Sequence, residues 1–321
     1  MARGNKPSHK RACPLSYHCC RAAIGLMMPF FMAGCATANA DRAPLRMTIT
    51  IDDVPVHGPV PAGQSSGQIS DQLIATLAQN EVPAVIFVNG IWTQTEPRTK
   101  DILERWDEAG FQLANHGWSH QHLSEISRAE FEAELLRNDE LLAHYGGSWR
   151  WFRYPFLDEG DTPDKRIAAR KLLAQHGYRV AAVTMDFGDW AWTAPYARCL
   201  SASDKAAIAK LETAYLQAAR EGIEYSRTLS HDVFNRDIPY VLLLHGGAMT
   251  AHMLPQLIEL YRTARFQFVT LEEAQSDAAY REDVDPDLPA RGQGLEGRAR
   301  EKSVPLPPRA SYSKMLESVC V

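Results

Sequence analysis

Cysteine is scarce in this chain of 321 residues once its first 40 residues are set aside. The six cysteines include four within that leader, and these are Cys13, Cys19, Cys20 and Cys35. Neither of the two that remain, Cys199 and Cys320, supports a cysteine zinc site, which needs several thiolates at short spacings. In an oxidising compartment the two could form a disulfide.

The amino-terminal apolar stretch, residues 22–33, is too short to cross a bilayer, since a spanning helix needs about 20 apolar residues. Five basic residues precede it and Ala-Asn-Ala at 38–40 follows it, which is the arrangement of a secretory signal. We therefore predict that residues 1–40 are a signal peptide and that the protein is exported, to the periplasm or the medium. Because Met-Ala-Gly-Cys ending at Cys35 resembles a lipobox, a lipid anchor in the membrane is the alternative.

Positive charge is in deficit. Five of the 34 Lys and Arg residues and none of the 39 Asp and Glu residues lie in the first 40 positions. The chain from residue 41 onward therefore has 29 basic and 39 acidic residues, a net charge of −10. So acidic a protein is poorly suited to phosphate contacts, and we expect no nucleic-acid partner.

Apolar, strand-like runs alternate with helical patterns along the chain. The seven runs are residues 45–51, 82–89, 111–116, 149–155, 178–185, 240–245 and 266–271. Several are almost wholly apolar, as strands covered on both faces are. The alternation predicts an α/β domain over residues 41–281, with a parallel sheet or barrel of about seven strands.

Two regions depart from this alternation. Residues 199–237 form a predicted helical insertion, whose apolar stripe favours packing on the barrel wall over a lid above a cleft. Residues 282–321 are rich in Pro, Gly, Arg and Glu, which predicts a flexible tail.

Chemically capable side chains fall where the predicted strands end. These residues are Asp52, Asp53, His116, Arg153, Asp186 and His245. Because the active site of an α/β barrel is built from the carboxyl ends of its strands, we expect them to lie close together. His116 and His120 are four residues apart, and two histidines with one carboxylate make the three-ligand site of a catalytic zinc.

Five stretches, in this order, resemble the polysaccharide deacetylase family, also called the NodB-homology family or carbohydrate esterase family 4. They are TIDDV (50–54), HGWSH (116–120), RYPF (153–156), DFGDW (186–190) and LLLH (242–245). The resemblance covers about residues 45–275 and implies a distorted (β/α) barrel. Val54 and Phe156 stand where the family pattern has Gly and Tyr.

The resemblance also implies roles for individual residues. Asp53, His116 and His120 would hold one divalent metal ion, usually zinc, for which Co²⁺ or Ni²⁺ can substitute. The implied chemical roles are Asp52 as general base, Arg153 as its orienting partner, His245 as general acid and Asp186 as the residue that tunes His245. Trp190 and Leu242 would line the acetyl pocket, and the backbone N–H of Phe156 would help to bind the oxyanion.

The implied reaction removes N-acetyl or O-acetyl groups from a polysaccharide or oligosaccharide. Chitin oligomers, peptidoglycan, exopolysaccharide and acetylated xylan all suit it. Two other readings compete. A serine esterase is suggested by GQSSG (63–67), although no strand pattern precedes the serine as a nucleophile elbow requires. A catalytically silent, carbohydrate-binding barrel would keep the metal residues without turnover.

Overall fold

The computed structural model describes residues 44–321, apart from 97, 147–149, 286–287 and 289–293. The predicted signal peptide and Cys35 lie outside the described residues. Among the helices of the described part, none has the length and apolar character needed to span a membrane.

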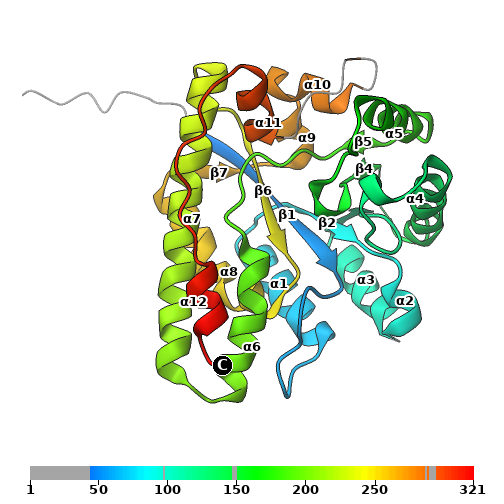
Figure 1. The fold of residues 1–321 in the computed structure, drawn as a ribbon. Coiled ribbons are helices and arrows are strands. Elements are labelled where there is room, and N and C mark those ends of the chain that lie inside the picture. Colours follow the sequence, from blue (N-terminus) through cyan, green and yellow to red (C-terminus); the bar gives the residue numbers. More distant parts are fainter. Residues whose placement is uncertain (1–43, 97, 147–149, 286–287, 289–293) are drawn as a thin grey trace, which may run out of the picture. The chain divides into compact units, whose positions relative to one another are not determined.

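Seven parallel strands form one sheet that curls into a half-barrel (Figure 1). Its order is β5-β4-β3-β2-β1-β6, with β7 paired to the start of β1. A single bridge between Met185 and Leu242 joins the segment after β5 to β6. The strands are β1 (Leu45–Val54), β2 (Ala84–Val88), β3 (Gln112–Asn115), β4 (Trp151–Phe152), β5 (Arg179–Val180), β6 (Tyr240–His245) and β7 (Phe266–Phe268). The predicted parallel α/β barrel is therefore confirmed.

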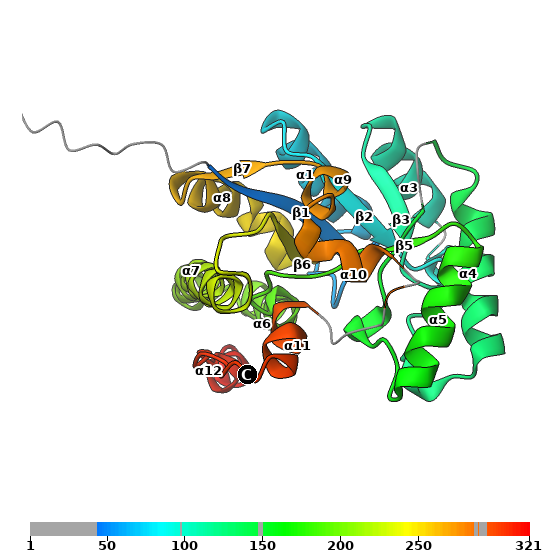
Figure 2. The same cartoon turned by 90° about the horizontal axis from the view of Figure 1, so that it is seen from above.

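Helices cover the sheet on both flanks, with α6 and α7 on one side and α4 and α5 on the other (Figures 1 and 2). The longer helices are α1 (Ser66–Gln79), α3 (Thr99–Glu108), α4 (Arg128–Leu142), α5 (Pro163–Gln175), α6 (Thr193–Ser201), α7 (Lys205–Phe234) and α8 (Ala248–Thr263). The shorter ones are α2 (Trp92–Thr95), α9 (Leu271–Gln275), α10 (Arg281–Val284), α11 (Gly294–Glu301) and α12 (Ser313–Ser318).

Sequence signals explain where several of these elements begin. Ser127 and Glu130 form the expected capping box at the start of α4. Strands β2 and β6 are buried along almost their whole length, which accounts for their continuous apolar sequence.

The region between β5 and β6 contains α6 and α7. Leu211 and Tyr215 on α7 are fully buried in the main core, and α7 packs against α6, α8 and α11. This helix is thus part of the wall of the domain.

The end of the chain differs from the flexible tail that its composition predicts. Residues 294–321 include α11 and α12, and Leu295, Ala299 and Leu316 are buried in the main core. A disulfide joins Cys199 of α6 to Cys320. Average composition could not predict this ordered structure, because the structure depends on a few apolar contacts and one disulfide.

Candidate active site

The two acids at the end of β1 face the same histidine. Successive side chains of a regular strand point to opposite faces. Asp53, however, has a left-handed backbone with φ of 61°, and the register with β2 shifts between Ile51 and Val54. As a result, His116 Nε2 lies 3.6 Å from Asp52 Oδ2 and 3.5 Å from Asp53 Oδ1. The strand end therefore presents both carboxylates to one place.

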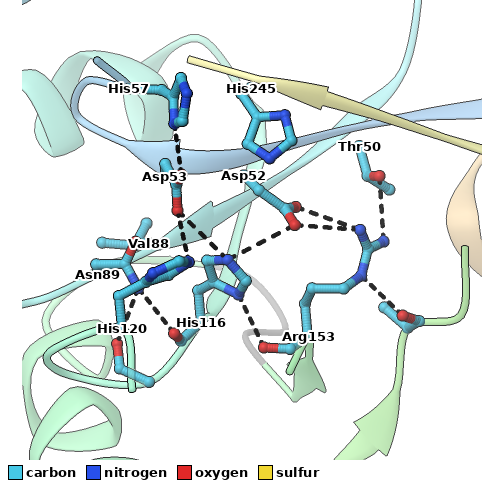
Figure 3. Close-up of polar contacts among 12 residues, drawn as sticks. Thr50, Asp52, Asp53, His57, Val88, Asn89, His116, His120, Arg153 and His245 are labelled. Atoms are coloured by element: carbon cyan, nitrogen blue, oxygen red, sulfur yellow. Dashed lines mark hydrogen bonds and ion pairs between the residues drawn. The ribbon is translucent and has the colours of Figure 1, made fainter. Parts of the chain in front are cut away.

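Asp53, His116 and His120 form a group that could hold a metal ion (Figure 3). Their ligand atoms all lie within 4.8 Å of one another, and His120 Nε2 is 3.1 Å from Asp53 Oδ1. His116 Nδ1 donates a hydrogen bond to the carbonyl of Arg153 at 2.8 Å, which leaves its Nε2 free to act as a ligand. Asp53 Oδ1 is buried with no hydrogen-bond partner. This donor set fits a divalent cation such as zinc.

The electrostatics of Asp53 agree with a ligand role. Burial alone would raise the pKa of Asp53, but the neighbouring histidines, His116, His120 and His57, outweigh burial and hold the pKa well below its usual value. The carboxylate is therefore ionised at neutral pH, as a metal ligand must be.

Asp52 is held by a buried arginine. Arg153 is almost fully buried, and its Nη1 donates to both oxygens of Asp52 at 3.3 Å. The same guanidinium donates to the carbonyl of Ala181 at 2.8 Å and to Thr50 Oγ1 at 3.1 Å. Burial lowers the pKa of Arg153, although Asp52 opposes that shift. The structure thus brings these two predicted site residues together in fixed geometry.

His245 ends β6 directly beside Asp52, its Cα register partner on β1. Its predicted partner was Asp186, and this assignment is wrong. Asp189 Oδ1 accepts from His245 Nδ1 at 2.8 Å, and Asp189 Oδ2 accepts from the backbone N–H of His245 at 2.8 Å. Asp186 Oδ1 instead accepts from the backbone N–H of Gly188.

The reason lies in the turn after residue 185. Gly188 has a left-handed φ of 72°, and a short 3₁₀ helix, Asp189–Trp192, follows it. This turn brings fully buried Asp189 back under His245. Burial alone would lower the pKa of His245, but Asp189 outweighs it and raises the pKa to about 9.

The three predicted substrate residues differ in exposure. Phe156 and Trp190 expose 56% and 54% of their surface, so both have aromatic surface open to solvent. The Phe156 ring stacks on His122 with a centroid distance of 3.8 Å. Leu242 is fully buried in the main core, and residues three apart in a strand face opposite sides. Leu242 therefore presents no surface beside His245, contrary to its predicted role.

Sequence reasoning missed His57 as well as Asp189. His57 Nδ1 lies 2.7 Å from Asp53 Oδ2, and its ring centroid is 4.8 Å from that of His245. The available signal was its spacing of four residues from Asp53.

The serine-esterase reading finds no support in the geometry. Ser65, the central serine of GQSSG, is the N-cap of α1, and its Oγ accepts from the backbone N–H of Gln68. The last strand before it, β1, ends at Val54. Ser65 therefore does not stand on the strand-to-helix elbow of such enzymes.

Residues 40–181 match the family model described as polysaccharide deacetylase. A chitin deacetylase of Colletotrichum lindemuthianum is 25% identical over 214 residues, which cover 64% of this chain and 74% of that protein. A peptidoglycan-N-acetylglucosamine deacetylase of Bacillus cereus is 20% identical over 38% of this chain, and the matched part spans 42% of that protein's length.

Solved structures show the same fold. The solved structure of the Colletotrichum lindemuthianum chitin deacetylase has a TM-score of 0.51 and 21% identity, covering 77% of this chain and 94% of that one. A carbohydrate esterase family 4 pseudoenzyme of Bacillus anthracis has a TM-score of 0.50 and 16% identity, covering 72% of this chain and 65% of that one. In its fold and over residues 40–181 of its sequence, the chain is thus similar to the polysaccharide deacetylase family.

Proposed function

We propose that this protein is a metal-dependent hydrolase that removes acetyl groups from an acetylated polysaccharide or oligosaccharide outside the cytoplasm. The observation that carries the proposal is the arrangement of Asp53, His116 and His120 beside an Asp52–Arg153 pair and an Asp189–His245 pair. The last pair lies beyond the part of the chain that matches the family model, so the site geometry supports it independently.

The proposed metal ligands are Asp53 Oδ1 and the Nε2 atoms of His116 and His120. Zinc is the usual ion for two histidines and one carboxylate with room for a further ligand. When bound, such an ion supplies Lewis acidity, which makes water more acidic and polarises a carbonyl group.

The reaction is the hydrolysis of an acetamide. Water adds to the acetyl carbon, the carbon–nitrogen bond breaks, and the products are acetate and an amine. Asp52 borders the metal ligands and is held by Arg153, so it can accept the proton that the attacking water loses. His245 has its Nδ1 fixed by Asp189, which leaves Nε2 to donate a proton to the leaving nitrogen.

The substrate is proposed to be a polymer of N-acetylglucosamine. Exposed Phe156 and Trp190 provide apolar faces next to the site on which a sugar ring can pack. The matched relatives are named chitin deacetylase and peptidoglycan-N-acetylglucosamine deacetylase, which favours N-acetyl over O-acetyl groups.

Export and the removal of residues 1–40 form part of the proposal, because the leader has the pattern of a secretory signal. A cytoplasmic protein that still carries this leader would contradict it.

The function is tested by measuring acetate release from N-acetylglucosamine oligomers, peptidoglycan and acetylated xylan with the protein from residue 41 onward. We expect release from at least one N-acetylated substrate. Binding of these sugars without any acetate release would instead favour a silent carbohydrate-binding barrel.

A further inference from the structure

His57 has no part in the proposed reaction, yet it contacts one of the proposed metal ligands. Its Nδ1 lies 2.7 Å from Asp53 Oδ2. Figure 3 shows His57 on the side of Asp53 opposite His116 and His120. Because a carboxylate can only accept, the hydrogen of this bond sits on Nδ1.

This contact gives the two carboxylate oxygens of Asp53 different partners. Asp53 Oδ2 is engaged by His57, whereas Oδ1 is turned toward His116 and His120 at 3.5 and 3.1 Å. Without a partner on Oδ2, rotation about the Cβ–Cγ bond would be free to exchange the two oxygens. The hydrogen bond from His57 removes that freedom.

His57 is itself firmly placed. Its backbone N–H donates to the carbonyl of Gly246 at 3.0 Å, just after His245. Its Nε2 lies 3.3 Å from the carbonyl of Trp190, and its side chain is 22% exposed. The backbone hydrogen bond to the loop after β6 therefore places His57 beside Asp53.

We propose that His57 is a positioning residue of the metal site, which fixes Asp53 with Oδ1 facing the two histidine ligands. The inference rests on the proposed metal site. Hydrogen-bond partners of metal ligands orient those ligands, and their loss typically weakens metal binding by about 10- to 100-fold. His57 is expected to contribute on that scale.

The test compares two replacements of similar shape. His57→Leu removes the hydrogen-bond donor, whereas the amide of His57→Asn can still donate to Asp53 Oδ2. Zinc affinity is measured on metal-free protein by competition with a chelator of known affinity. We expect His57→Leu to bind zinc about 10- to 100-fold more weakly than the parent protein, and His57→Asn to recover most of that loss.

His231→Asn is the matched control, since His231 Nε2 makes a similar contact with Asp237 Oδ2 at 3.1 Å, away from the site. It should bind zinc like the parent. Thermal unfolding of the metal-free variants checks that each is folded; if His57→Leu is not, His57→Ala takes its place in the comparison. The role of His57 would be overturned if the variant that lacks the donor bound zinc as tightly as the parent. It would also be overturned if His57→Asn bound zinc as weakly as that variant. A parent protein that binds no zinc would instead overturn the proposed function itself.

Discussion

At the scale of single residues, the two adjacent acids Asp52 and Asp53 are distinguished by what surrounds them. Asp52 faces the guanidinium of Arg153, and Asp53 faces three histidines. The left-handed backbone at Asp53, uncommon for a residue other than glycine, makes this division possible. This division fits the roles proposed for the two acids, in which Asp52 accepts a proton and Asp53 binds the metal.

Asp52→Asn separates these two roles. The amide keeps the size of the side chain but cannot act as a base, so acetate release should fall by about 100- to 10,000-fold. Zinc content, measured on the same preparation, should stay at the parental level. Asp53→Asn is the matched variant and should lose zinc. If Asp52→Asn is the one that loses zinc, the two carboxylates are assigned the wrong way round.

Asp189 and Asp186 can be distinguished through the pH dependence of the rate. His245 must be protonated to act as an acid. Because its pKa is raised to about 9, kcat/KM should fall only as the pH rises through that value. Asp189→Asn removes the charge that raises this pKa, so the alkaline limb of the kcat/KM profile should move to lower pH. Asp186→Asn should leave the limb in place. The opposite pattern would restore the prediction made from sequence.

Much of the site could be predicted because its residues follow strand ends, and strand ends converge at one face of a barrel. Asp189 could not be predicted as the partner of His245, because its position depends on the left-handed turn at Gly188. His57 could not be predicted either, because its contact with Asp53 depends on the turn between them, and the hydrophobic pattern of the sequence gives no information about that turn. Local backbone geometry, not residue type, decided both.

At the scale of elements, the buried strands were visible as apolar runs, but their lengths were not. The runs predicted over 149–155 and 178–185 contain only two-residue strands, β4 and β5. Beyond β5 the chain pairs with β6 through a single bridge at Met185. Pairing depends on register with distant partners, which the sequence of one segment does not contain.

Leu211→Ala tests the assignment of α7 to the wall of the domain. Leu211 is fully buried, so the truncation should lower the free energy of unfolding by about 2–5 kcal/mol in a denaturant titration. Leu136→Ala on α4, where the leucine is 40% exposed, is the control and should change stability by less than about 0.5 kcal/mol. A mobile lid would instead leave Leu211→Ala nearly as stable as the parent.

At the scale of the whole molecule, the carboxyl-terminal segment is bound to the rest of the described chain by several separate contacts. Cys320 is joined to Cys199, Tyr312 donates to Glu221, and Arg198 donates to the carbonyl of Leu316. Arg309 lies 3.4 Å from the carboxylate of Asp186, on the turn that leads to Asp189. The segment therefore contacts the loop that carries Asp189, the partner of His245.

Cys320→Ser tests how much the disulfide contributes to the stability of the protein. The disulfide links residues 121 positions apart. Closing such a loop lowers the entropy of the unfolded chain, which stabilises the folded protein by about 2–4 kcal/mol. The variant should lose about that much stability in a denaturant titration under oxidising conditions. A reducing agent should destabilise the parent to the same extent and leave Cys320→Ser unchanged. Equal stability of parent and variant would show that the link contributes nothing.

The central claim is that a metal ion held by Asp53, His116 and His120 is required for deacetylation. It is tested most directly by acetate release from N-acetylglucosamine oligomers, measured before chelation, after chelation and after zinc is restored. We predict that release disappears on chelation and returns with zinc, and that His116→Ala shows no such recovery because a site with two protein ligands is incomplete. Undiminished acetate release from metal-free protein would contradict the account.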